Sequence, residues 1–262
     1  MNLEKKALDT RLAIFDIVCK SKKGHIGGAF SSVDLLVSLY YNEIFDFIST
    51  KKAKDKFILS KGHICIALYA ILADLNMIDN ELFQNYCADG NVLYGHPDIC
   101  VNGVECTTGS LGNGIGVASG MALSYKMDKI NKHVVALLGD GECNEGSVWE
   151  AVMFASHHKL SNLICIVDRN RQCATDFTKS CNKLDPFADK WKSFGWNTIE
   201  CDGHNMKDIY DSFIYAKQSD CPTVIIAETI KGKGISFMEK CVKWHHGIPS
   251  EKEIQIAKEE LK

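Results

Sequence analysis

Short apolar runs recur along the chain and are separated by segments with the apolar spacing of helices. The runs predict strands at Phe57–Leu59, Val134–Leu138, Leu163–Val167, Trp196–Glu200 and Thr223–Ala227. They are apolar without alternation, as expected for parallel strands that are covered on both faces. The helical spacing predicts helices at Leu3–Lys20, Val33–Phe47, Ile64–Leu75, Gly112–Lys126, Ser147–His158, Met206–Lys217 and Glu251–Leu261. This alternation predicts an α/β fold, a parallel sheet with helices on both faces.

Composition and charge exclude several classes of protein. The chain has 262 residues, of which 46% are hydrophobic and 24% charged, and the values match an ordinary globular protein. No linker divides the chain, so we expect a single domain over residues 1–262. A net charge of −3 argues against binding to nucleic acid or to an anionic membrane. No signal segment and no apolar run of roughly 20 residues is present, so we expect a cytoplasmic protein without a membrane span.

Twelve cysteines raise the question of a disulfide framework or a zinc site. A disulfide framework belongs to small secreted chains, and this chain is long and lacks a signal segment. A zinc site needs closely paired ligands such as C-x-x-C, and no two cysteines are that close. We therefore expect reduced and mostly buried thiols.

Two polar loops follow neighbouring apolar runs. Gly139-Asp140-Gly141 comes directly after the run Val134–Leu138, and Asp168-Arg169-Asn170 comes directly after Leu163–Val167. One helix lies between them, so the stretch has the length of a single crossover of roughly 30 residues between parallel strands. Asp140 and Asn170 should then meet at the carboxyl edge of the sheet, where such sheets bind ligands. Their oxygens suit Mg²⁺ or Ca²⁺, and the glycines let backbone N–H groups approach an anion. The loops predict a metal–diphosphate site.

Six glycine- and histidine-rich loops carry a wider resemblance. They are Lys23–Gly28 (KGHIGG), Ser60–His63 (SKGH), Tyr94–Pro97 (YGHP), Thr107–Gly114 (TTGSLGNG), Gly139–Gly146 (GDGECNEG) and Trp244–Gly247 (WHHG). With the Asp168-Arg169-Asn170 loop, and in this order, they resemble the N-terminal, thiamine diphosphate-binding part of the transketolase family. One such loop alone is weak evidence, but six in the family's order are specific. The resemblance covers almost the whole chain.

The resemblance implies a metal site. Asp140 and Asn170 would hold Mg²⁺ with their side-chain oxygens, and the backbone carbonyl of Gln172 would supply the third protein ligand. Ca²⁺ or Mn²⁺ could take the place of Mg²⁺. The family usually has glycine and an apolar residue where this chain has Arg171 and Gln172. A backbone ligand tolerates that change.

The resemblance also implies sites for the rest of the cofactor. His63, His246 and the Gly141 N–H would bind the diphosphate, and a shift of one residue would exchange His246 for His245. Imidazole N–H groups can donate to phosphate oxygens without a full positive charge. Asn170 would contact both the metal and the cofactor.

Five further residues complete the implied site. Gly109 and Leu111 would meet the aminopyrimidine or thiazolium ring. Glu145 would be a buried carboxylate at the contact between subunits. His25 and His96 would line the substrate funnel, hydrogen-bond the sugar oxygens and move protons. With the two diphosphate histidines they form the implied catalytic set.

The resemblance implies an activity and a missing partner. Transketolases move a two-carbon ketol unit from a ketose, often a sugar phosphate, to an aldose, and thiamine diphosphate performs the chemistry. This chain has no second α/β unit for the pyrimidine-binding domain, so it resembles the N-terminal subunit of a split transketolase, with two copies of each subunit expected. Two alternatives remain: a subunit of another thiamine enzyme, either deoxyxylulose-phosphate synthase-like or 2-oxo acid dehydrogenase α-like, and an inactive cofactor-binding subunit that serves assembly.

Overall fold

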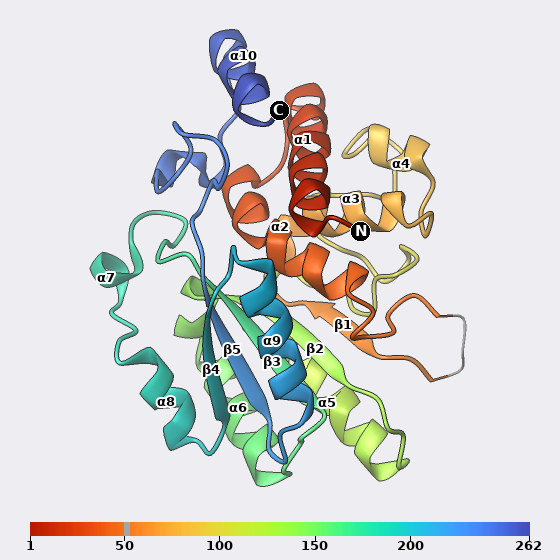
Figure 1. The fold of residues 1–262 in the computed structure, drawn as a ribbon, viewed down its shortest axis with the longest axis vertical. Helices are drawn as coiled ribbons and strands as arrows, with labels where there is room; N and C mark the ends of the chain where they lie inside the picture. The colour runs from red at the N-terminus through yellow and green to blue at the C-terminus, as the bar shows by residue number, and fades with distance from the viewer. Residues whose placement is uncertain (50–52) are drawn as a thin grey trace.

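A computed structural model describes residues 1–49 and 53–262. Its strands are β1 (Lys56–Leu59), β2 (Val134–Gly139), β3 (Leu163–Arg169), β4 (Asn197–Asp202) and β5 (Thr223–Glu228). In the described part of the chain they form one sheet in the order β1-β2-β3-β5-β4, and every neighbouring pair is parallel. Figure 1 shows this sheet at the centre of the molecule. The predicted parallel α/β fold is confirmed.

Helices surround the sheet. They are α1 (Leu3–Ser21), α2 (Ile26–Tyr41), α3 (Cys65–Asp74), α4 (Asn80–Gln84), α5 (Gly114–Met127), α6 (Gly146–His157), α7 (Thr178–Cys181), α8 (Phe187–Ser193), α9 (Met206–Lys217) and α10 (Glu251–Glu260). Short 3₁₀ turns are η1 (Gly62–Ile64), η2 (Gly141–Asn144) and η3 (Val242–His245). Figure 1 shows α9 in front of the sheet, with α5 and α6 behind it.

The sheet separates two apolar cores. Val135 and Leu137 of β2 pack into the core that α1, α2, α3 and α9 cover. Val134 and Ala136 of the same strand pack into the opposite core, under α5, α6 and α8. Successive side chains of a strand point to opposite faces, so a continuous apolar run fills both cores at once.

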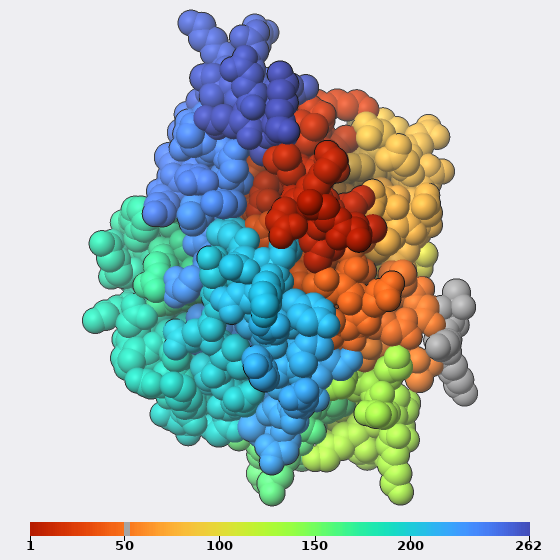
Figure 2. Space-filling model, in the orientation of Figure 1, coloured from red at the N-terminus to blue at the C-terminus, as the bar shows by residue number. Residues whose placement is uncertain are grey.

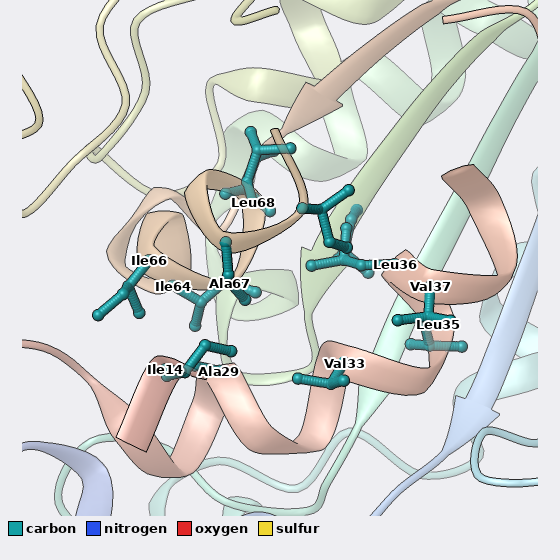
Figure 3. Packing of buried hydrophobic residues seen from close by; sticks show 14 of the residues in the cluster. Ile14, Ala29, Val33, Leu35, Leu36, Val37, Ile64, Ile66, Ala67 and Leu68 are labelled. Atoms are coloured by element: carbon teal, nitrogen blue, oxygen red, sulfur yellow. The ribbon is translucent and has the colours of Figure 1, made fainter. Parts of the chain in front are cut away.

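Helix α2 is the centre of the first core. All its residues from Ile26 to Tyr40 are buried. Figure 3 shows Ala29 of α2 and Ile14 of α1 lying beside Ile64, the last residue of η1, and Ala67 of α3. The first turn of α2 is therefore fixed in place, and it carries Gly27 and Gly28 to the edge of the sheet.

The structure corrects several element boundaries. The helix expected at Val33–Phe47 begins at Ile26 and ends at Tyr41. Its Gly27-Gly28 pair reads as a loop in sequence, but the carbonyl oxygen of Trp244 lies 2.6 Å from where a Cβ on Gly27 would be, so glycine serves close packing there. The strand expected at Trp196–Glu200 runs from Asn197 to Asp202. The short helices α4, α7 and α8 were not predicted.

The two ends of the chain pack together. Figure 2 shows the dark blue C-terminal segment standing against the red N-terminal helix. An ion pair between Lys258 of α10 and Asp16 of α1, with N···O 2.8 Å, joins them. Among the described residues, no helix combines the length and the apolar character that crossing a membrane requires.

Candidate active site

A cavity of about 280 Å³ lies at the carboxyl ends of β2 and β3. Gly139 at the end of β2 pairs with Asp168 of β3, so the loops after these strands lie side by side. The cavity is lined by Gly28, Lys61, His63, Gly109, Leu111, Gly139, Asp140, Gly141, Glu142, Asn170, Gln172, Cys173, Ala174, Lys231 and His245. Residues from segments far apart in the sequence therefore meet where an open α/β sheet binds ligands.

The side chains of Asp140 and Asn170 are held by hydrogen bonds to backbone N–H groups and to the Asp168 carboxylate. The two carboxylate oxygens of Asp140 accept from the N–H of Gly141 at 2.7 Å and of Arg171 at 2.6 Å. Asn170 Nδ2 donates to Asp168 at 3.1 Å, which fixes the amide orientation, and its Oδ1 accepts from the N–H of Gln172 at 3.1 Å. Burial, together with the nearby Asp168 carboxylate, raises the pKa of Asp140 to about 6.

These oxygens fit a hard cation better than a transition metal. Among residues 1–49 and 53–262, no group of three or more His, Cys, Asp or Glu side chains could hold a metal by itself. One carboxylate, one amide oxygen and a loop carbonyl suit Mg²⁺, which keeps ligands from water and from substrate phosphates. The buried amide of Gln172 has no hydrogen-bond partner among the described residues, so the cavity wall presents unused polar groups. The donor set fits the metal that the sequence predicts.

A buried cluster lies beneath this site. Asp168 is fully buried and accepts from Lys61 Nζ, Ser31, Ser32 and Thr229. Burial would raise the pKa of Asp168, but the Lys61 ammonium and the hydrogen bonds hold it below its usual value. The charge of Lys61 is therefore already matched by Asp168. Lys61 acts in the structure as the partner of this carboxylate at the cavity floor.

Lys231 is different, because it is buried without a carboxylate partner. Its Nζ donates to the carbonyl of Cys173 at 2.9 Å and contacts Nδ1 of His245 at 2.9 Å. No ion pair involving Lys231 occurs among the described residues. Burial and the nearby Lys61 charge lower the pKa of Lys231 to about 8. A cation in this position is suited to an anionic ligand.

Two neutral histidines lie near Lys231. The rings of His63 and His245 have their centroids 5.4 Å apart. Burial lowers the pKa of His63 well below its usual value and that of His245 to about 3. Each imidazole therefore keeps one N–H and one lone pair at neutral pH.

A second cavity, of about 470 Å³, is lined by Lys23, Gly24, His25, Tyr86, Cys87, Ala88, Asp89, Gly90, Tyr94, Gly95, His96 and His246. The ring of His25 lies 4.8 Å from His246, 5.2 Å from His63 and 6.2 Å from His96, measured between centroids. Burial, with His246 and His96 nearby, lowers the pKa of His25 to about 4. Its buried Nδ1 has no partner among the described residues. The ring of His25 therefore lies between a histidine of the first cavity, His63, and those of the second, His96 and His246. Its Nδ1 can hydrogen-bond to a ligand, because no described residue occupies it.

The structure gathers most of the predicted residues into these two cavities. The first is lined by Asp140, Asn170, Gln172, Gly141, His63, Gly109 and Leu111, and the second by His25, His96 and His246.

His246 was predicted beside the diphosphate, but the structure places it on the second cavity instead. His245 ends the turn η3, and the backbone leaves that turn at His246 with a φ of −144°. The two rings flank the ring of His25, with centroids 5.2 Å (His245) and 4.8 Å (His246) from it, and they line different cavities. His245 contacts Lys231 and lines the first cavity, which is the position that the one-residue shift left open by the sequence requires.

Glu145 lines neither of these cavities. It was predicted as a carboxylate buried at the contact between subunits; in this single chain it is exposed at the start of α6, and its burial in an assembly stays a prediction. The buried carboxylate of the same loop is Glu142, which accepts from Ser60 Oγ at 2.5 Å and from the N–H groups of Gly112 and Gly139 at 2.9 and 3.0 Å. Glu142 lies in the turn η2, which directs it back toward the strand ends, whereas Glu145 follows that turn.

Several residues of the first cavity were not predicted from the sequence. They are Lys61, Glu142, Cys173 and Lys231. Lys61 lies inside the Ser60–His63 motif and Glu142 inside the Gly139–Gly146 motif. Their place at the site could therefore have been predicted from these motifs. Lys231 follows the last strand, and the glycines beside it suggest a flexible loop in sequence. The one sequence feature that could have predicted Lys231 at the site is its position after β5, which ends at the same edge of the sheet as β2 and β3.

Comparisons with known proteins agree with this geometry. The family model "Transketolase, thiamine diphosphate binding domain" matches residues 3–262. One subunit of the apulose-4-phosphate transketolase of Phocaeicola vulgatus is 39% identical over 264 residues, covering 99% of this chain and 93% of that relative. The 6-deoxy-6-sulfo-D-fructose transketolase subunit SqwG of a Clostridium species is 37% identical over 250 residues, covering 94% of this chain and 91% of that relative.

Solved structures give the same result. The transketolase of Campylobacter jejuni superposes with a TM-score of 0.91 at 30% sequence identity. The match covers all of this chain and 43% of that one, so the chain spans less than half the length of the solved enzyme. The full-length match of the family model and the similarity to the two subunits lead to one conclusion: the chain belongs to the transketolase family and corresponds to its thiamine diphosphate-binding domain.

Proposed function

We propose that this chain is the N-terminal subunit of a split transketolase, which moves a two-carbon ketol unit from a ketose to an aldose. One observation carries the proposal. The buried Lys231, which has no ion-pair partner among the described residues, lines the same cavity as the oxygens of Asp140 and Asn170. A cation-binding set and an anion-binding set on one cavity fit a metal-bound diphosphate.

Different residues of the first cavity would bind the metal, the diphosphate and the rings of the cofactor. Asp140, Asn170 and the carbonyl of Gln172 would hold Mg²⁺, which Ca²⁺ or Mn²⁺ could replace. Lys231, His63, His245 and the Gly141 N–H would hold the diphosphate. Gly109 and Leu111 would contact the ring systems, since both line the cavity. Bound there, thiamine diphosphate supplies the carbon nucleophile for ketol transfer.

The histidines of the second cavity would act on the substrate. Burial keeps His25 neutral, with its pKa at about 4, so it can donate or accept a hydrogen bond at neutral pH. Its unpartnered Nδ1 is available to a sugar oxygen. His96 and His246 line the same cavity and would orient the remaining hydroxyl groups. Proton transfer to and from these oxygens is general acid–base work.

A partner subunit would cover the outer surface of α5 and α6. Val117, Met153 and Phe154 are exposed there, and a Cβ on Gly116 or Gly120 would meet nothing within 4 Å. An open apolar surface of this kind is suited to another chain. Because relatives that match over nearly their whole length are named as single subunits of transketolases, we assign this surface to a complementary subunit with the pyrimidine-binding domain, in two copies of each chain.

Glu145 would belong to that contact. It is exposed in this chain beside Gly112, at the same surface. Its carboxylate would become buried when the partner binds. We further propose that the chain is a single domain that works in the cytoplasm, a compartment in which free thiols such as its twelve cysteines stay reduced. The substrate would be a ketose with an anionic end, as the names of the phospho- and sulfosugar enzymes suggest.

Calorimetry on the full chain tests the cofactor site. With Mg²⁺ present, the chain should bind thiamine diphosphate and should not bind thiamine at the same concentration. Asp140→Ala should remove the Mg²⁺ dependence, because one of the three protein ligands is lost. Asp176→Ala, in the loop after Gln172, is the matched control and should bind normally. Unchanged Mg²⁺-dependent affinity in Asp140→Ala would contradict the site.

A further inference from the structure

The segment after Asn170 is a tightly closed loop that brings two cysteines together. Gln172 and Phe177 form an isolated antiparallel bridge. The N–H of Cys173 donates to the carbonyl of Asp176 at 2.8 Å, and the N–H of Thr178 donates to that of Arg171 at 2.9 Å. Helix α7 follows at once and ends at Cys181. The chain therefore doubles back between Cys173 and Cys181.

The two thiols differ in what they face. Cys173 is half-buried on the wall of the first cavity, and its Sγ lies 3.2 Å from where a Cβ on Gly141 would be. Cys181 is exposed, and its Sγ lies 3.8 Å from Oγ1 of Thr175, inside the same loop. The N–H of Cys181 donates to the carbonyl of Phe177 at 3.1 Å, which turns Cys181 back toward the strand-like start of the loop. Burial and the neighbouring Cys181 thiol raise the pKa of Cys173 to about 11. A surface thiol and a cavity thiol thus belong to one closed loop.

Among the cysteines that the structure describes, no other pair combines an exposed thiol with a thiol on the first cavity in one closed loop. Cys65, Cys143, Cys165 and Cys201 are buried in the cores. Cys100 is exposed, but it lies outside this loop and lines neither cavity. The Cys173–Cys181 pair is therefore distinguished by position, by exposure and by its contact with the candidate cofactor site.

We propose that Cys173 and Cys181 are a thiol–disulfide modification site whose oxidation weakens cofactor binding. The oxidant is a peroxide. The exposed Cys181 sulfur attacks a peroxide oxygen and becomes a sulfenic acid, and one water leaves. The Cys173 sulfur then displaces the second water and forms the S–S bond. Two thiols and one hydrogen peroxide give one disulfide and two waters, and a small thiol reverses the change by exchange.

The effect on the site follows from the Cys173 backbone. Its carbonyl accepts from Lys231 Nζ at 2.9 Å, and the preceding residue, Gln172, carries the proposed metal-ligand carbonyl. A disulfide requires the two Cβ atoms to come to about 3.8 Å, which draws Cys173 toward Cys181. That movement displaces both groups. This consequence depends on the proposed function, whereas formation of the disulfide does not.

Peptide mapping tests formation of the bond. The reduced chain is treated with hydrogen peroxide, alkylated and digested with trypsin, which cuts after Arg171, Lys179 and Lys183. We expect Gln172–Lys179 and Ser180–Lys183 to be recovered as one linked species that separates on reduction. Cys181→Ser should lose it, and Cys100→Ser, the exposed-cysteine control, should keep it. Absence of the linked species from the wild-type chain, or pairing of Cys181 with another cysteine, would overturn the proposal.

Calorimetry tests the effect on binding. Thiamine diphosphate with Mg²⁺ is titrated into the oxidised and the reduced chain, and into both after treatment with dithiothreitol. We expect at least tenfold weaker binding to the oxidised chain, restored by dithiothreitol, and no effect of peroxide on Cys181→Ser. Equal binding to the linked and reduced forms would overturn the regulatory part. Failure of the reduced chain to bind at all would instead reject the proposed function, because mapping judges the disulfide separately.

Discussion

Nζ of Lys231 lies 2.9 Å from Nδ1 of His245, on the wall of the first cavity. Burial lowers the pKa of His245 to about 3, so its Nδ1 can accept from the lysine. The pair comes from the loop after β5 and from the turn η3, and it meets Asp140 and Asn170 from the ends of β2 and β3. This convergence is the basis of the proposed cofactor site.

Lys231→Met should weaken Mg²⁺-dependent binding of thiamine diphosphate. A charged hydrogen bond to phosphate contributes about 2 kcal/mol, so we expect roughly 30-fold weaker binding. Lys233→Met, a change to the neighbouring lysine of the same loop, should bind within about threefold of the wild type. Calorimetry measures both. Equal affinities for the two variants would remove Lys231 from the site.

Cofactor binding should take up protons at alkaline pH. The pKa of Lys231 is lowered to about 8 in the free chain, and a bound diphosphate favours the ammonium and raises it. The complex then holds more protons than the free chain above pH 8, so affinity is highest below pH 8 and falls as pH rises.

Titrations at pH 8.5 in two buffers of different ionisation enthalpy measure this uptake. The wild-type chain should take up protons from the buffer, and Lys231→Met should take up fewer. If the wild type and the variant gave the same proton uptake, a different group would be responsible for the pH dependence.

His245→Ala and His246→Ala should have different effects, because the two rings face different cavities. We expect His245→Ala to weaken cofactor binding about tenfold, the loss of one hydrogen bond to a charged group. His246→Ala and His96→Ala should keep cofactor affinity and lower the turnover of the assembled enzyme. The reverse pattern would return the diphosphate role to His246.

His204 should position the Lys231 loop. Its Nδ1 lies 2.6 Å from a carboxylate oxygen of Asp34, and its Nε2 accepts from the N–H of Ile230 at 2.8 Å. His204→Phe removes that acceptor, so the assembled enzyme should need about tenfold more cofactor, while turnover at saturating cofactor stays near normal.

The matched control for this change is His133→Phe. His133 also lies beside an aspartate, Asp55, at 3.7 Å, but it is remote from both cavities. It should leave the cofactor requirement unchanged. An equal loss of turnover in the His204 and His133 variants would indicate general destabilisation rather than positioning.

Much of the fold can be predicted from the local pattern of apolar residues along the sequence. The runs around Val135 and Ile164 specify buried parallel strands, and the alternation with helices leaves few arrangements. Where the local pattern was misleading, a distant contact explains the residue: glycine stands at position 27 of α2 because the Trp244 carbonyl leaves no room for a Cβ, not because the segment is a loop. The same holds for the site. Asp140 and Asn170 follow from strand order, whereas Lys231 and the choice of His245 depend on how the segment after β5 folds back over α2.

We propose that this chain is the subunit of a ketol transferase that binds the diphosphate of the cofactor. This assignment is tested most directly by two-carbon transfer from a phosphorylated ketose to an aldose, with Mg²⁺ and thiamine diphosphate, with and without a complementary transketolase subunit. We expect turnover only when both chains are present, and no turnover when the Asp140→Ala variant of this chain is combined with the complementary subunit. Full activity of this chain alone, or no activity of an assembled complex that binds the cofactor, would contradict it.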